Sequence, residues 1–108
     1  MVTKITPSSG NVFADLGFSS EVAEHLRIRS TLMSELRKHI EARGLIQADA
    51  AKLFGVTQPR ISNLVRGRID LFSIDTLVDM LTRAGVRVDV VLSPGDKGAA
   101  STLARQEP

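Results

Sequence analysis

The chain has 108 residues, of which 43% are hydrophobic and 24% charged, as in an ordinary single globular domain. Cysteine is absent, which excludes disulfides, thiolate metal sites and cysteine nucleophiles, and no apolar run resembles a signal peptide or a membrane span. The formal charge is only +2, but residues 43–68 alone carry five cations and one acid. We therefore expect a cytoplasmic protein, without a membrane segment, whose positive charge is gathered in one phosphate-binding region.

The first 18 residues are expected to form an N-terminal arm followed by a short packed segment. Residues 1–10 show no period and end in Pro, Ser and Gly, which predicts a flexible arm. Residues 11–18 contain several large apolar side chains, so we predict a turn or short strand that packs on the body of the domain or on a partner. These side chains are Val12, Phe13, Leu16 and Phe18.

A long amphipathic helix is predicted next. Ser19 and Ser20 precede two acids, and a hydroxyl N-cap followed by acids in the first turn marks a helix start. Gly44 is suited to the left-handed conformation that ends many helices. Helix propensity is poorer at residues 30–31, where the helix is expected to break if it breaks at all. The predicted buried stripe consists of Val22, Leu26, Met33, Leu36 and Ile40.

Two short helices follow, over residues 47–54 and 58–65. Gly55 ends the first and supplies the positive φ that a tight turn between them needs. Thr57 caps the second helix, and Pro59 falls in its first turn, where the missing N–H costs nothing. Two short helices joined in this way cross at a steep angle.

The C-terminal part is predicted to contain one more helix, one strand and a tail. Ser73 caps the helix, and Gly85 ends it. Residues 86–92 begin with alternating apolar and charged side chains, which predicts a strand with one buried face. Residues 95–108 have no sustained period and are expected to form a flexible tail. The buried face of the helix is expected to contain Ile74, Leu77, Val78 and Leu81.

The helix over residues 58–65 carries the most informative surface. Gln, Asn and Arg side chains can make paired hydrogen bonds to base edges in the major groove of DNA. No acid occurs between Asp49 and Asp70, which is unusual for a merely solvated surface and favourable opposite phosphates. Ile61 and Leu64 are expected to anchor the helix in the core. The outward residues are predicted to be Gln58, Arg60, Asn63 and Arg66.

The stretch from Leu45 to Gly67 resembles the XRE (Cro/cI-type) helix-turn-helix family. Together with residues 11–17, 72–77 and 86–92, it resembles the HigA-like antitoxins of that family, over residues 11–94 in all. The resemblance implies an all-α, lambda-repressor-like bundle of four or five helices plus one C-terminal β-strand. The expected organisation is an arm and packed segment over 1–18, a DNA-binding domain over 19–94 and a tail over 95–108.

The resemblance also implies a role for each residue of the DNA-binding site. Residues at the start of the recognition helix make base contacts, and flanking residues contact backbone phosphates. Pro59 departs from the polar residue often found at its position, which removes one base contact. Each residue also has a simpler interpretation, as ordinary solvated surface. The implied phosphate contacts are Gln47, Arg66 and Arg68, and the implied base contacts are Thr57, Gln58, Arg60 and Asn63.

The expected function is repression of transcription by a homodimer bound to double-stranded operator DNA, since palindromic operators match a two-fold symmetric protein. The dimer is expected to form through the C-terminal strand and the last helix. The resemblance to HigA-like proteins implies an antitoxin that also neutralises a RelE/HigB-like toxin, through a surface involving the N-terminal segment and the first helix. The alternative is a stand-alone repressor, from a phage or a metabolic operon, without a toxin partner.

Enzymatic and metal-binding functions are not expected. His25 and His39 are fourteen residues apart with no cysteine near them, which is not the spacing of a metal site. The sequence contains no nucleotide-binding fingerprint and no glycine-rich phosphate loop. We therefore predict a binding protein that uses no cofactor.

Overall fold

The structure, a computed structural model, describes residues 11–94. Residues 11–88 form one unit, and residues 89–94 belong to a second. The arm predicted for residues 1–10 and the tail predicted for residues 95–108 lie outside the described residues. All the helices described below belong to the first unit.

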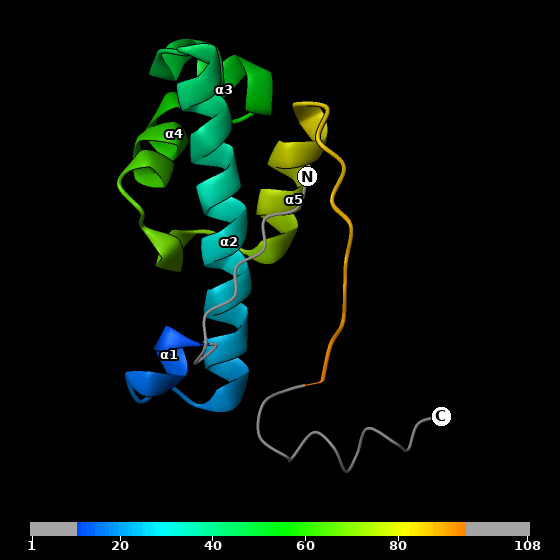
Figure 1. The fold of residues 1–108 in the computed structure, drawn as a ribbon. Coiled ribbons are helices and arrows are strands. Elements are labelled where there is room, and N and C mark those ends of the chain that lie inside the picture. Colours follow the sequence, from blue (N-terminus) through cyan, green and yellow to red (C-terminus); the bar gives the residue numbers. More distant parts are fainter. Residues whose placement is uncertain (1–10, 95–108) are drawn as a thin grey trace. The chain divides into compact units, whose positions relative to one another are not determined.

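The longest helix, α2 (Ser20–Arg43), is the element around which the others are arranged (Figure 1). The Ser19 side chain accepts a hydrogen bond from the Val22 N–H, and Gly44 ends the helix with a φ of 61°, as predicted. The break considered at residues 30–31 does not occur. The Thr31 hydroxyl donates to the Arg27 carbonyl at 3.1 Å, one turn back, and packing of the following turns stabilises the helix against local propensity.

Four further elements follow α2 along the chain. α3 (Gln47–Phe54) and α4 (Gln58–Val65) are the two short helices predicted from the sequence. A short 3-10 helix, η1 (Ile69–Leu71), then leads to α5 (Ile74–Arg83). α4 and α5 lie on opposite sides of the C-terminal half of α2, and α3 contacts both of them (Figure 1).

The hydrophobic core is enclosed between α2, α3, α4 and α5. Val22 and Leu26 were predicted to be buried, but Val22 is exposed and Leu26 is only half-buried, because the later helices cover only the C-terminal part of α2. Ile74 and Val78 are likewise half-buried, and the sequence interpretation missed Met80, which is fully buried. The core cluster consists of Met33, Leu36, Ile40, Ala50, Ala51, Phe54, Ile61, Leu64, Phe72, Leu77, Met80 and Leu81.

The segment before α2 forms a short helix, α1 (Val12–Asp15), and not the turn or strand expected. The Asn11 side chain explains this, because its Oδ1 caps the helix start by accepting hydrogen bonds from the N–H groups of Phe13 and Ala14. A helix of four residues is too short to show a hydrophobic period, so the sequence pattern could not indicate it.

The strand predicted over residues 86–92 is not formed, and residues 11–94 contain no strand at all. The alternating pattern describes which side chains are buried, but a strand also needs a neighbour to pair its backbone N–H and C=O groups. Val86 and Val88 are partly buried against the core in an extended segment. Val90, Val91 and Leu92 are highly exposed.

The described residues contain neither a candidate membrane-spanning helix nor a candidate metal site. None of its helices is long and apolar enough to cross a membrane. Within the same residues, no group of His, Asp and Glu side chains is arranged so that it could hold a metal ion.

Candidate nucleic-acid interface

The turn between α3 and α4 is built on Gly55, which adopts a φ of 71°. The Val56 N–H donates to the Ala51 carbonyl at 3.0 Å, which closes the end of α3. A Cβ atom on residue 55 would lie 2.5 Å from the Arg83 side chain, so the turn is also covered closely by α5. Thr57 is the N-cap of α4, and its hydroxyl accepts a hydrogen bond from the Arg60 N–H at 3.3 Å. This geometry fixes the direction in which α4 leaves the turn.

Small and apolar side chains hold α3 against α4. Ala50 and Ala51 are buried on α3, where small residues permit a close crossing, and Ile61 and Leu64 are fully buried on α4. The remaining surface of α4 faces away from the core. The two helices therefore form the helix-turn-helix arrangement that the sequence predicts, with one face of the second helix free for a ligand.

The outward surface of α4 carries three of the predicted site residues along its length. Gln58 and Arg66 are exposed at its two ends, and Asn63 is half-buried between them. The Asn63 Oδ1 accepts from an Nη of Arg66 at 3.3 Å, so these two side chains share one patch. Together they offer amide and guanidinium donors and amide acceptors, the groups that recognise base edges.

Arg60 is placed differently from the outward position expected for it. Its Nη1 donates to the Leu71 carbonyl at 3.0 Å, and its Cζ lies 5.2 Å from the centroid of the Phe72 ring. The side chain is half-buried and connects α4 to η1. Phe72, which is buried beside it, is a member of this arrangement that the sequence interpretation did not include.

These contacts predict that Arg60→Ala destabilises the fold. The variant loses a cation–π contact of about 0.5–1 kcal/mol and a hydrogen bond of about 0.5–1.5 kcal/mol, so we expect the free energy of unfolding to fall by about 1–2.5 kcal/mol. Urea denaturation followed by circular dichroism measures it. Arg66→Ala, on the exposed surface at the other end of the same helix, is the matched control and is expected to change stability by less than about 0.5 kcal/mol. Equal stability of the two variants would contradict a structural role for Arg60.

Two predicted phosphate contacts lie at the ends of the helix-turn-helix unit. Gln47 is the first residue of α3 and is exposed, and Ile46 before it provides no side-chain cap for the N–H groups of that helix end. Arg68 is exposed in the turn after α4, where its Nε lies 3.6 Å from an Asp70 carboxylate oxygen. Because both partners of this ion pair are solvated, it contributes little to stability and does not prevent Arg68 from binding a phosphate.

Arg68→Ala is therefore expected to weaken binding to all DNA sequences alike. If Arg68 neutralises one phosphate, the slope of log K against log salt becomes shallower by about one. Fluorescence anisotropy of labelled duplexes over a range of salt concentrations measures that slope. Lys38→Ala, which removes an exposed cation from α2, is the control and is expected to leave the slope unchanged. An unchanged slope for Arg68→Ala would remove this residue from the interface.

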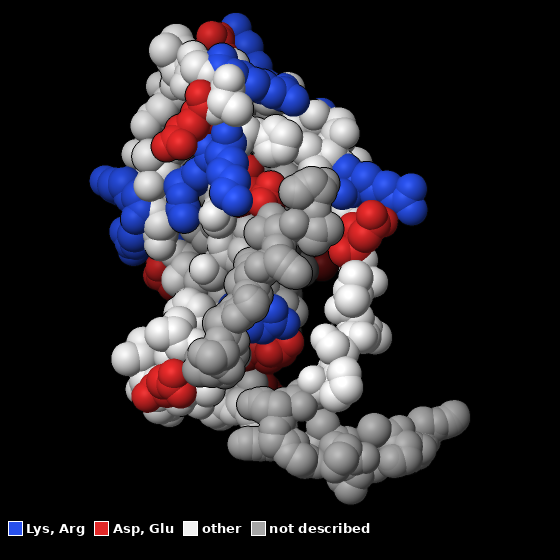
Figure 2. Space-filling view, viewed as in Figure 1, with Lys and Arg blue, Asp and Glu red and all other residues white. Residues whose placement is uncertain are grey.

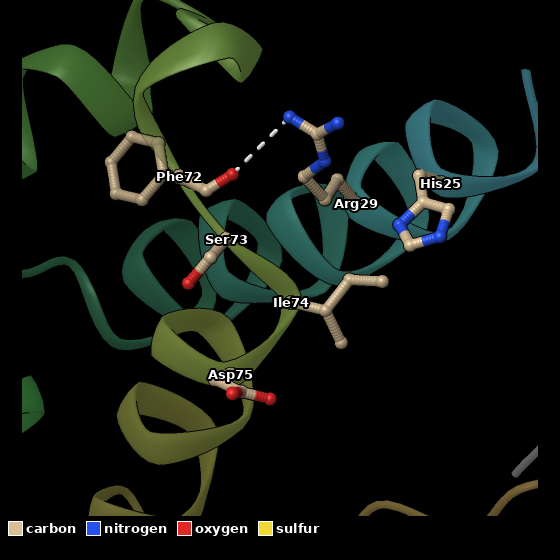
Figure 3. A pocket seen from close by; sticks show the side chains of 6 residues that line it. All are labelled: His25, Arg29, Phe72, Ser73, Ile74 and Asp75. Atoms are coloured by element: carbon tan, nitrogen blue, oxygen red, sulfur yellow. Dashed lines mark hydrogen bonds between the residues drawn. The ribbon is translucent and has the colours of Figure 1, made fainter. Parts of the chain in front are cut away.

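The turn after α4 is held in place by two arginines of α2 that the sequence interpretation missed. Arg37 donates to the Leu64 carbonyl at 3.5 Å, near the end of α4. Arg29 donates from one Nη to the carbonyls of Ile69 and Phe72, at 3.2 and 3.4 Å. Figure 3 shows Arg29 reaching from α2 toward the Phe72 carbonyl, at the side of an open pocket that also includes His25 and Asp75. These contacts span 27 to 43 residues, a separation over which no local pattern could predict a pairing.

The charge of this unit is mostly positive, with Asp49 at the start of α3 and Asp70 after α4 as the acids that flank it. The residues from Ala50 to Ile69 include one lysine and three arginines and no acid. In Figure 2, Lys and Arg side chains gather at the edge of the molecule where α4 ends. The α3–α4 unit thus combines a positive surface with amide side chains, and this combination suits a nucleic acid.

A family model described as a helix-turn-helix domain matches residues 12–93, from the first residue of α1 to almost the end of the described chain. The family it describes includes HigA-like antitoxins and is not known for catalysis. No curated protein matches the sequence.

Proposed function

The chain belongs to the helix-turn-helix domain family, whose members bind DNA, and we propose that it recognises an operator sequence and represses transcription from it. The observation that supports this best is the outward face of α4. It presents Gln58, Asn63 and Arg66 on a helix that itself contains no acid, and this helix is anchored by fully buried residues. An α-helix of this kind fits the major groove, where amides and guanidinium groups distinguish base pairs.

The proposed site divides into base contacts and phosphate contacts. At the start of α4, Thr57 and Gln58 are the first to reach base edges. The Nη1 of Arg60 donates a hydrogen bond to the Leu71 carbonyl, and no described residue accepts one from its other guanidinium nitrogens. These other nitrogens are proposed to reach DNA. Asn63 completes the base-reading set. The proposed phosphate contacts are Gln47, Arg66 and Arg68.

A homodimer is proposed because a single helix-turn-helix module buries too little surface for a tight and specific complex. Two copies would place their recognition helices about 34 Å apart, one turn of DNA. Val90, Val91 and Leu92 are a run of exposed apolar side chains, and such a run is a candidate for burial against a second copy.

Within this function, we assign the chain to the antitoxins, as a repressor that binds its own operon and neutralises a RelE/HigB-like toxin. The support is the membership in a family that includes HigA-like antitoxins and the resemblance of residues 11–94 to them. A stand-alone repressor is the alternative. Co-expression with the product of the adjacent reading frame separates the two. Rescue of growth and a stable complex are expected for an antitoxin, and a neighbour that is neither toxic nor bound supports the alternative.

Titration of the purified chain into labelled DNA from upstream of its own reading frame tests the operator-binding proposal. We expect an affinity about a thousandfold or more above that for a scrambled duplex at about 150 mM salt, since specific complexes typically exceed non-specific ones by that margin. Gln58→Ala is expected to reduce this preference, whereas Lys38→Ala is expected to leave it intact. Equal affinity for the two duplexes would contradict sequence-specific repression.

A further inference from the structure

The outward side of α4 is centred on four residues with the spacing i, i+3, i+4 and i+7, which we call the outward row. It consists of Pro59, Ser62, Asn63 and Arg66. Residues with this spacing share one side of an α-helix, and the fully buried Ile61 and Leu64 occupy the opposite side of α4. The outward row is therefore the part of α4 that lies furthest from the core, and it would lie deepest in a groove of DNA.

Pro59 is the apolar member of the outward row and stands at its N-terminal end. It is the second residue of α4, and its side chain is exposed. A proline costs nothing at this place, because an N–H group in the first turn has no partner within the helix. Side chains at the start of a recognition helix meet base edges. The pyrrolidine ring, which has neither a donor nor an acceptor, thus lies where a base contact is expected.

The polar residues on either side of Pro59 do not belong to the outward row. Each residue of a helix advances by about 100° around its axis, so Gln58 and Arg60 lie on opposite flanks of the row. Arg60 is turned toward η1 by its contacts with Leu71 and Phe72. Gln58 is exposed on the other flank. At the start of α4, the centre of the outward side is therefore the apolar ring, and polar groups lie beside it.

One base offers this ring a matching surface. In the major groove, the C5 methyl group of thymine is the apolar group that base edges present, and the other groups there are hydrogen-bond donors and acceptors. A donor or acceptor pressed against the ring would lose its water without gaining a hydrogen bond, which disfavours the other bases. The ring is also rigid, so it loses no rotamer freedom when it becomes buried.

We infer that Pro59 recognises a thymine in each operator half-site, by packing its ring against the C5 methyl group of that base. This inference rests on the proposed function and deepens it. The sequence predicted that a proline at this position removes a polar base contact. The position of the ring assigns an apolar base contact in its place.

Replacement of thymidine by deoxyuridine tests the assignment, because it removes the methyl group and leaves every hydrogen-bonding group of the base pair in place. The full chain is titrated into the labelled upstream duplex that it prefers over a scrambled one, with each thymidine replaced singly. We expect the affinity to fall about fourfold at one thymine of each half-site, the loss that corresponds to one buried methyl group. A bound duplex in which no deoxyuridine lowers the affinity would overturn the inference.

Variants of α4 connect the lost methyl group to Pro59. Pro59→Ser is expected to bind the thymidine and deoxyuridine duplexes equally well, because its side chain offers the methyl group no apolar surface. Pro59→Val, which restores an apolar side chain, is expected to keep the preference for thymidine. Val65→Ser is the matched control, since it removes an apolar side chain that is 45% exposed on the same helix but outside the outward row, and it is expected to keep the full preference.

The outcomes separate a base contact from a structural role of Pro59. Circular dichroism of the Pro59 variants measures whether α4 still forms. If Pro59 only begins the helix, Pro59→Ser weakens binding to both duplexes alike and keeps the preference for thymidine, which would refute the assignment. An unmodified chain that binds no upstream duplex better than a scrambled one would instead refute the proposed function.

Discussion

Phe54→Ala is expected to lower the free energy of unfolding by about 3–5 kcal/mol, the typical cost of removing a buried phenyl ring. Phe54 closes α3, has no exposed surface and belongs to the core cluster shared by α2, α4 and α5. Domains of this size are commonly stable by only about 5–15 kcal/mol, so the variant is expected to be partly unfolded and to lose DNA binding with its fold.

Urea denaturation monitored by circular dichroism measures this effect. Phe18→Ala is the matched control, since it removes the same ring from a site that is 47% exposed, and it is expected to cost less than about 1 kcal/mol. Phe54→Leu is expected to fall between the two, because it leaves a smaller cavity. Equal stability of Phe54→Ala and Phe18→Ala would contradict the position of Phe54 at the centre of the domain.

Replacing Val90, Val91 and Leu92 together by serine is expected to produce a monomer that binds a full operator at least about a hundredfold more weakly. In a dimer, the second recognition helix binds intramolecularly, at an effective concentration that adds a factor of about 10²–10⁴ to the affinity. The loss is expected to be confined to the full operator, because binding of one copy to an isolated half-site does not use these residues.

Analytical ultracentrifugation and anisotropy with full and half operators measure the two effects. Leu16→Ser, which removes one equally large exposed side chain near the other end of the chain, is expected to remain dimeric. A wild-type chain that is monomeric at micromolar concentration, or a triple variant that binds the full operator normally, would contradict the proposed dimer surface.

The helices of the central part could be predicted because local signals determine their ends. The side chains of Ser19, Thr57 and Ser73 accept hydrogen bonds from backbone N–H groups at helix starts, and Gly44 and Gly55 end two helices with positive φ. Such contacts join residues within one turn, so their patterns are visible in a single sequence.

The errors occur where the outcome depends on more distant groups. The alternation in residues 86–92 correctly indicated that Val86 and Val88 face the core. It wrongly indicated a strand, because no strand in the described chain lies beside this segment to pair with it. Val22 was assigned to a buried stripe because the helical period continues through it, although the helices that bury this stripe do not reach it.

In the candidate site, too, local signals could be predicted from the sequence and contacts between distant residues could not. The period of α4 placed Gln58, Asn63 and Arg66 on its outward face. It did not indicate that Arg60 would bind the Leu71 carbonyl and lie over Phe72, because these partners come from another element. The roles of all the predicted DNA contacts stay predictions until binding is measured.

The bonds from Arg29 and Arg37 to backbone carbonyls have a consequence for the thermodynamics of recognition. They fix the turn that carries Arg68 while the protein is free, so little motion remains to be lost when the turn meets a sugar–phosphate chain. Association at this edge is then a docking of preformed surfaces. Its heat capacity change would reflect the area brought together and contain no contribution from folding of the protein.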